Sequence, residues 1–176
     1  MCNHRRSAVI VVGMTMLFNP WSTGFAASES AAYAAASKSA GTTEINRGRY
    51  MVLVSHCNNC HTAGYTTSHG NLPERQWLLG NPVGYRGPAG TTYASNLRLS
   101  VGNFTEEQWV NYAKAVKPRP PMPWWSLHAT ADRDLRAMYK YIRHLGPAGQ
   151  PAPQYLPPDR EPNPPYELRQ LVKGRR

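Results

Sequence analysis

The stretch Cys57-Asn58-Asn59-Cys60-His61 decides how the rest of the sequence is interpreted. Two cysteines separated by two residues, with a histidine directly after the second, form the pattern to which a haem group is covalently attached. This spacing lets both sulfur atoms reach the two vinyl groups on one edge of the porphyrin, while the histidine binds the iron as its proximal ligand. We therefore expect one covalent haem c, bound by Cys57, Cys60 and His61.

Other uses of a close cysteine pair fit this sequence less well. A structural zinc site needs about four ligands, commonly from two such pairs, and the chain has only one further cysteine, Cys2. A thioredoxin-like dithiol would lie in a βαβ unit, whereas the pattern around this motif is helical. Cysteines this close in sequence also cannot hold a secreted fold together as a disulfide scaffold. Haem attachment remains the best interpretation.

The sixth position of the iron decides whether such a haem carries electrons or binds ligands. Met122 is the leading candidate, because the prolines on both sides of it make segment 120–123 rigid and extended, so that its thioether can be held in place toward the iron. A sulfur ligand there favours the reduced state and raises the reduction potential. His128, six residues further on, is the main alternative. Two other histidines are weaker candidates: His69 and His144. Two other methionines are expected to fill the core: Met51 and Met138.

The first 26 residues are expected to be a cleaved signal peptide. Two arginines precede an apolar run over residues 8–18, and small residues lead up to Ala26, where signal peptidase would cut. The apolar run is shorter than the ~20 residues that a membrane span requires. We therefore expect export to the periplasm, where cytochrome c maturation occurs.

The exported part of the chain divides into three regions. Residues 27–43 are small and polar and predict a flexible leader. Residues 44–147 contain the motif and the helical patterns, and predict the folded domain. Residues 148–176 are rich in proline with a basic end, and predict an extended tail that is dispensable for haem ligation.

Three segments of the folded domain have helical periodicity. The first is expected to start at Thr43 and to deliver the chain into the motif. The second starts at Thr105, where Thr105 and Gln108 form a capping box. The third places apolar residues at helical spacing before a stop at Gly146. Its apolar positions are Leu135, Met138, Tyr139 and Ile142. The ~45 residues between the first two helices show no convincing strand, and a loop of that length is reasonable only if it wraps a large ligand. The fold expected is therefore all-α, with three main helices and long loops around one haem c.

Several segments between about Asn46 and Pro147 carry a resemblance to a known family. They are Arg47-Gly48-Arg49-Tyr50, Cys57 to Thr62, Ser95-Asn96-Leu97, Phe104 to Val110, Met122-Pro123-Trp124, and Asp134-Leu135 with Tyr141-Ile142-Arg143. In order and spacing they resemble a class I cytochrome c domain, more narrowly the cytochrome c modules associated with membrane-bound alcohol, aldehyde and gluconate dehydrogenases. The resemblance implies that residues 44–147 are a cytochrome c domain.

The resemblance also implies that the first and last helices cross. Gly48 would allow the close approach of an aromatic residue such as Tyr141 or Tyr139. The residues support this independently, because a glycine inside a helix costs up to ~1 kcal/mol unless packing requires it. Six residues are candidates for lining the haem or binding its propionates: Trp77, Tyr85, Arg86, Asn96, Arg98 and Trp124.

The charge balance limits the kinds of binding partner that are expected. The chain has 20 Lys and Arg against 10 Asp and Glu, which suits a solvated basic surface as well as a docking surface for acidic partners. Nucleic acid is not expected, because an exported protein meets little of it. The basic end from Tyr166 to Arg176 is a candidate for peripheral attachment to a membrane or a complex.

The function expected is that of a periplasmic mono-haem c-type cytochrome and not of an enzyme. It would carry one electron at a time from a dehydrogenase to a terminal acceptor or oxidase, as a soluble shuttle or as the electron-transfer subunit of a complex. The alternative is an open-site haem protein, such as a peroxidase or a gas-binding protein. In that case Met122 would be a core residue.

Overall fold

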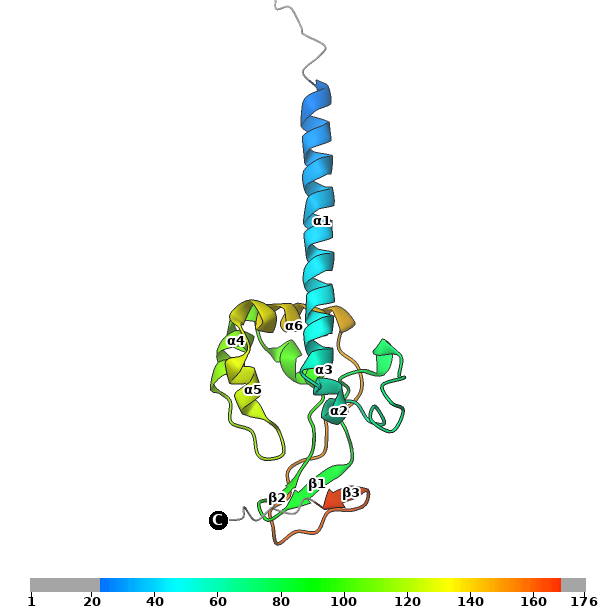
Figure 1. The fold of residues 1–176 in the computed structure, drawn as a ribbon, viewed down its shortest axis with the longest axis vertical. Coiled ribbons are helices and arrows are strands. Elements are labelled where there is room, and N and C mark those ends of the chain that lie inside the picture. Colours follow the sequence, from blue (N-terminus) through cyan, green and yellow to red (C-terminus); the bar gives the residue numbers. More distant parts are fainter. Residues whose placement is uncertain (1–22, 169–176) are drawn as a thin grey trace, which may run out of the picture. The chain divides into compact units, whose positions relative to one another are not determined.

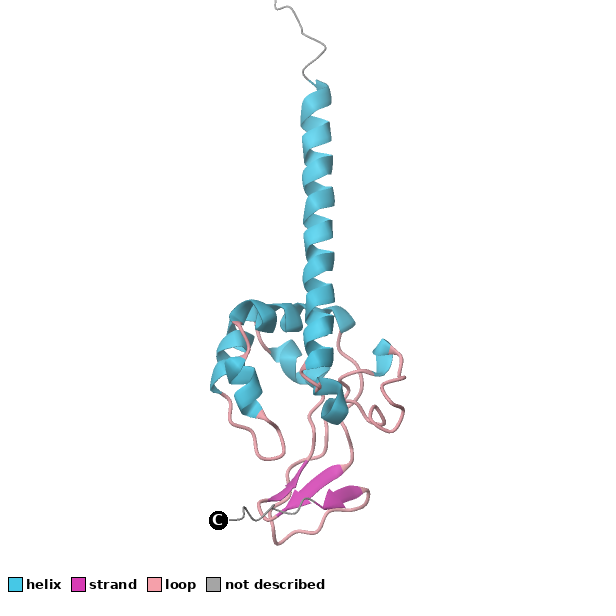
Figure 2. Ribbon diagram, in the orientation of Figure 1, coloured by secondary structure: helices cyan, strands magenta, loops and turns pink. Residues whose placement is uncertain are grey.

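The computed structural model describes residues 23–168 (Figures 1 and 2). The chain divides into two compact units, one ending at Lys38 and the other starting at Ser39. The helices are α1 (Thr23–Val54), α2 (Cys57–His61), η1 (Glu74–Gln76), α3 (Leu97–Ser100), η2 (Val101–Asn103), α4 (Glu106–Ala115), α5 (Trp124–Ala129) and α6 (Asp132–Leu145). Most of them are short, and α1 is the longest. The strands are β1 (Gly84–Gly87), β2 (Gly90–Thr92) and β3 (Tyr166–Leu168).

Helix α1 begins 20 residues before the start that the sequence suggested. Residues 27–43, expected to be a flexible leader, are helical, which the strong helix propensity of their many alanines explains. Thr43 is inside the helix and not its N-cap, since its hydroxyl donates to the carbonyl oxygen of Ser39 at 3.0 Å. Residues 1–22, the larger part of the expected signal peptide, lie outside the described residues. Within residues 23–168, no helix is long and apolar enough to cross a membrane.

The core of the unit that starts at Ser39 is built on α6, whose inward face was predicted correctly. Leu135, Met138 and Ile142 are buried on that face as expected, whereas Tyr139 is only half-buried and Tyr141 is buried in addition. Helix α4 packs against α6, and the indole nitrogen of Trp109 donates to the carbonyl oxygen of Leu135 at 3.1 Å. Helix α6 is terminated by Gly146, which has a positive φ of 71°. The periodicity of the third helical segment therefore identified the centre of the core.

The predicted crossing of the first and last helices is confirmed. The backbone of α1 at Gly48 lies against α6, and a Cβ atom there would be 2.0 Å from the carbonyl oxygen of Ala137 and 2.7 Å from Cβ of Tyr141. Only glycine fits at this point. The predicted capping box of α4 is also present: Gln108 N donates to the Thr105 hydroxyl, and Thr105 N donates to the Gln108 side chain.

The expectation of an all-α fold is wrong in one respect, because the structure contains a small three-stranded sheet in the order β2-β1-β3 (Figure 2). Strands β1 and β2 pair antiparallel through a tight turn, with Tyr85 opposite Thr92. Strand β3 pairs parallel with β1, with Tyr85 opposite Glu167. Strands of three or four residues are too short to show alternation in the sequence. Their pairing comes from tertiary contacts.

The C-terminal segment, expected to be an extended tail, forms backbone hydrogen bonds with the sheet. Leu156 and Thr91 exchange two backbone hydrogen bonds, of 2.8 and 3.0 Å. The guanidinium of Arg86 donates to the carbonyl oxygen of Arg160 at 2.8 Å. Prolines remove donors from this segment, but the non-proline residues between them still pair with the sheet. The segment up to Leu168 is therefore part of the folded unit, while residues 169–176 lie outside the described part of the chain.

Candidate functional site

The Cys57–His61 motif forms α2, a single helical turn that is fixed at its end by the loop that follows it. His56, directly before the turn, has left-handed backbone angles (φ 58°, ψ 27°), which reorients the chain after α1. Gly80 N donates to the carbonyl oxygen of His61 at 2.8 Å. The hydroxyl of Thr62 accepts from Leu78 N at 2.8 Å and donates to the side chain of Asn58 at 2.7 Å. These bonds hold His61 in a defined orientation.

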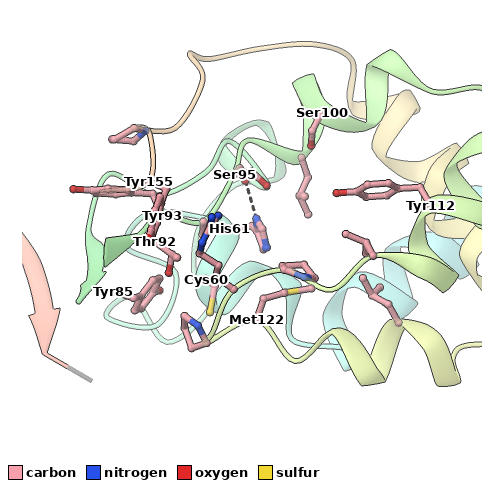
Figure 3. Close-up of a pocket in the computed structure, with 18 of the residues that line it drawn as sticks. Cys60, His61, Tyr85, Thr92, Tyr93, Ser95, Ser100, Tyr112, Met122 and Tyr155 are labelled. Atoms are coloured by element: carbon pink, nitrogen blue, oxygen red, sulfur yellow. Dashed lines mark hydrogen bonds between the residues drawn. The ribbon is translucent and has the colours of Figure 1, made fainter. Parts of the chain in front are cut away.

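The hydrogen bonding and burial of the His61 ring would suit a metal ligand. Its Nδ1 lies 2.7 Å from the carbonyl oxygen of Ser95, and since a carbonyl only accepts, Nδ1 must donate (Figure 3). In the neutral ring the proton is then on Nδ1, which leaves the lone pair on Nε2 for a metal. Burial lowers the pKa of His61, and the bond to Ser95 opposes only part of that shift. The ring is therefore neutral at physiological pH.

His61 opens into a cavity of about 410 Å³, within the size range of a cofactor site. The surrounding side chains are largely apolar or aromatic and come from α3, α4, the loop before α5, the sheet and the C-terminal segment. Around the His61 ring, Figure 3 shows Tyr85 and Tyr155 on one side and Tyr112 on the other. The cavity thus lies between the sheet and the helices of the unit.

The two cysteines occupy different positions at this cavity. Cys60 lines it directly beside His61, whereas Cys57 packs against the hydrophobic core one helical turn earlier. Burial raises the pKa of the Cys57 thiol to about 12. A spacing of three residues puts both sulfur atoms on the same side of the turn. One thiol on the wall of a cavity that also presents a histidine, with the second thiol one turn away on the same side, fits the attachment of a haem.

Met122 and His128, the two candidates for the sixth ligand, are placed differently. Met122 lines the same cavity as His61 and comes from the loop between α4 and α5 (Figure 3). His128 is not among the residues around that cavity. Its Nε2 donates to the carbonyl oxygen of Val116 at 3.0 Å, and its ring packs on Trp124 at 4.9 Å. The two weaker histidine candidates are exposed: His69 and His144.

Of the six residues suggested as neighbours of the cofactor, only Tyr85 lines the cavity. Trp77 belongs to the core and donates to the carbonyl oxygen of Leu72. Asn96 caps α3 through the backbone N of Leu99. Arg98 donates to the carbonyl oxygens of Arg75, Leu145 and Gly146, so it stabilises the end of α6. The other two, Arg86 and Trp124, contact Arg160 and His128 respectively.

Sequence reasoning missed the contribution of the sheet and the C-terminal segment to this cavity. Thr92 and Tyr93 line it from the sheet side, and Pro153 and Tyr155 line it from the C-terminal segment. The ring of Tyr155 also lies under the guanidinium of Arg119, with Cζ 3.8 Å from the ring centroid. The one signal in the sequence was the aromatic side chain of Tyr155 itself, because an aromatic ring in a proline-rich stretch needs something to pack against.

The donor set suits a haem better than a metal ion bound by protein ligands alone. Within residues 23–168, no group of three or more His, Cys, Asp or Glu side chains lies close enough to hold an ion. One neutral imidazole, one thioether and the thiol of Cys60 line a largely apolar cavity, with the thiol of Cys57 one helical turn away, and these groups fit a haem c.

Comparison with known proteins finds two curated relatives. The cytochrome subunit of a fructose dehydrogenase from Gluconobacter japonicus is 30% identical over 127 residues, which is 66% of this chain and 24% of the relative. The cytochrome c subunit of a quinone-type alcohol dehydrogenase from Gluconobacter oxydans is 29% identical over 124 residues, 63% of this chain and 23% of the relative. The chain spans about a quarter of the length of these relatives. No protein-family model and no solved structure matches it.

Proposed function

We propose, from the relationship of this chain to the cytochrome c subunits of bacterial dehydrogenases, that it is a periplasmic mono-haem c-type cytochrome. It would pass single electrons from a dehydrogenase to a cytochrome or oxidase acceptor, either as a soluble shuttle or as a subunit of a complex. The observation that carries the proposal is the placement of His61, Cys60 and Met122 around one cavity. The haem iron would supply the one-electron exchange, and the protein would supply ligands and a docking surface.

Each residue of the site has a defined part in this proposal. Cys57 and Cys60 would form the thioether bonds, so that the cofactor stays bound in both oxidation states. His61 would bind the iron through Nε2, with its orientation set by the carbonyl oxygen of Ser95. Met122 would supply the sixth ligand and raise the reduction potential. A thioether in that position excludes peroxide and oxygen, which favours an electron carrier over an enzyme.

The surface beside Met122 supports redox partners with acidic surfaces. Lys117 and Arg119 are exposed on the loop that carries Met122, and Trp125, in the helix α5 that follows this loop, is 60% exposed. A positive rim beside the cofactor increases the association rate with a negatively charged protein. Nucleic acid is not a proposed partner. The basic C-terminal end remains a candidate for attachment to a complex or an anionic membrane.

Carbon monoxide distinguishes an electron carrier from an open-site haem protein. The reduced wild-type protein should bind it poorly, whereas Met122→Ala should bind it readily, lose the weak charge-transfer band between sulfur and ferric iron, and have a lower reduction potential. His128→Ala and Met51→Leu are matched controls that should keep the wild-type spectrum. Ready binding of carbon monoxide by the wild type would contradict the proposal and favour a peroxidase or gas-binding protein.

A further inference from the structure

The C-terminal segment 148–168, here called the strap, is fixed to the rest of the unit at both of its ends. At its start, the side-chain amide of Asn96 donates to the carbonyl oxygens of Ala148 and Gln150, at 2.8 and 3.2 Å. At its end, strand β3 pairs with β1. A segment held at two ends has little freedom in between. The strap therefore has a defined path over the sheet.

The middle of the strap fits tightly against the turn between β1 and β2. Gly90 has a φ of +94°, and a Cβ atom there would be 2.3 Å from the carbonyl oxygen of Leu156 and 2.9 Å from the ring of Tyr155. The hydroxyl of Tyr155 donates to the carbonyl oxygen of Ala89 at 3.0 Å. The turn and the strap are thus in direct contact. Tyr155 is fixed by the hydrogen bond of its own hydroxyl to Ala89 and by the backbone pairing of the next residue, Leu156, with Thr91.

The loop that carries Met122, residues 116–123, has few means of anchoring itself. Four of its eight residues are prolines, which have no backbone N–H to donate. Its position must then come from side chains and from other segments. The structure shows two such anchors just before Met122. The guanidinium of Arg119 lies over the ring of Tyr155 at 3.8 Å, and the hydroxyl of Thr92 donates to the carbonyl oxygen of Pro120 at 2.9 Å.

We infer that the strap positions the sixth ligand: Tyr155, through its contact with Arg119, holds the loop so that Met122 stays in the cavity opposite His61. This inference rests on the proposed ligation by Met122. Tyr155 and Arg119 line the same cavity as Met122, so the contact forms part of the cavity wall beside the ligand. Tyr155 is a positioning residue, since it acts through Arg119. This inference differs from the sequence-based expectation that the C-terminal tail is dispensable for ligation.

The test measures how easily an added ligand displaces Met122. Imidazole is titrated into the ferric holoprotein, and its affinity and the sulfur-to-iron charge-transfer band are followed by absorbance. Tyr155→Ala and Arg119→Ala should each bind imidazole roughly five- to tenfold more tightly than the wild type, the effect expected from one lost cation–π contact. The double variant should resemble either single variant, because both remove the same contact. Truncation after Gln150 should have at least this effect.

Two variants serve as controls. Tyr155→Phe loses the hydrogen bond to Ala89 but keeps the ring under Arg119, and it should retain most of the wild-type resistance to imidazole. Tyr50→Ala removes a tyrosine that is 59% exposed on α1 and should leave the affinity unchanged. The inference fails if Tyr155→Ala matches Tyr50→Ala, or if the effects of Tyr155→Ala and Arg119→Ala add in the double variant. A wild-type protein without the charge-transfer band would overturn the proposed ligation by Met122 as well. The failure of that ligation is therefore distinguishable from the failure of the positioning role of Tyr155, which leaves the band of the wild type in place.

Discussion

Gly48 of α1 lies so close to α6 that a Cβ atom on it would be 2.0 Å from the carbonyl oxygen of Ala137. Gly48→Ala should therefore force the two helices apart and lower the free energy of unfolding of the holoprotein by at least about 2 kcal/mol. Gly41→Ala, in the same helix with no atom within 4 Å of the new Cβ, should be neutral or stabilising by up to ~1 kcal/mol. Denaturant titration measures both, and equal stabilities for the two variants would contradict the close approach.

Stability should depend on the charge of Glu74. Its carboxylate accepts from the Arg49 guanidinium and from the Tyr141 hydroxyl, and these bonds lower the pKa of Glu74 although burial raises it. A group with a lowered pKa in the folded state stabilises it fully above the ordinary pKa, and this contribution is lost as the pH falls through the folded pKa. Glu74→Gln should thus be less stable than the wild type at neutral pH, and the difference should shrink in acid.

A carboxylate elsewhere on the surface provides the control for this pH profile. Asp159→Asn removes one exposed carboxylate of the strap. Its stability should follow that of the wild type at each pH, measured by denaturant titration. If Glu74→Gln kept the same deficit at acidic and neutral pH, the carboxylate would not be the source of the stabilisation.

The capping box of α4 should contribute measurably to stability. Thr105→Ala removes the hydroxyl that accepts from Gln108 N, and should lower the free energy of unfolding by about 1 kcal/mol. Thr105→Ser keeps the hydroxyl and should retain most of that contribution. The comparison of the two variants isolates the cap from any change in packing. A loss of equal size in Thr105→Ser would point to packing of the methyl group.

Features that depend on neighbours in sequence could be predicted, and these include the capping box, the inward face of α6 and the motif. Gly48 could be predicted because a glycine inside a helix needs a packing reason. The sheet could not, because β1 and β3 are separated by about 80 residues and each is too short for a pattern. The role of Tyr155 was missed for the same reason, since its partners, Arg119 and Ala89, are distant in sequence.

Without haem the domain should not fold cooperatively. The cavity between His61 and the loop of Met122 would be filled by water, and the short helices bury too little apolar surface to offset roughly 1–2 kcal/mol of backbone entropy per residue. The variant Cys57→Ala/Cys60→Ala, purified without haem, should show no cooperative thermal transition by circular dichroism. A cooperative thermal transition in this haem-free variant, at any temperature, would contradict this.

The intact mass of the mature protein tests the central claim most directly, because one covalent haem per chain underlies every proposed role. The protein is expressed in a host that matures c-type cytochromes, purified after export, and measured by mass spectrometry under denaturing conditions. We predict a mass equal to the chain cleaved near Ala26 plus one haem, and the mass of the chain alone for Cys57→Ala/Cys60→Ala. A wild-type mass equal to that of the polypeptide with two free thiols would contradict the account.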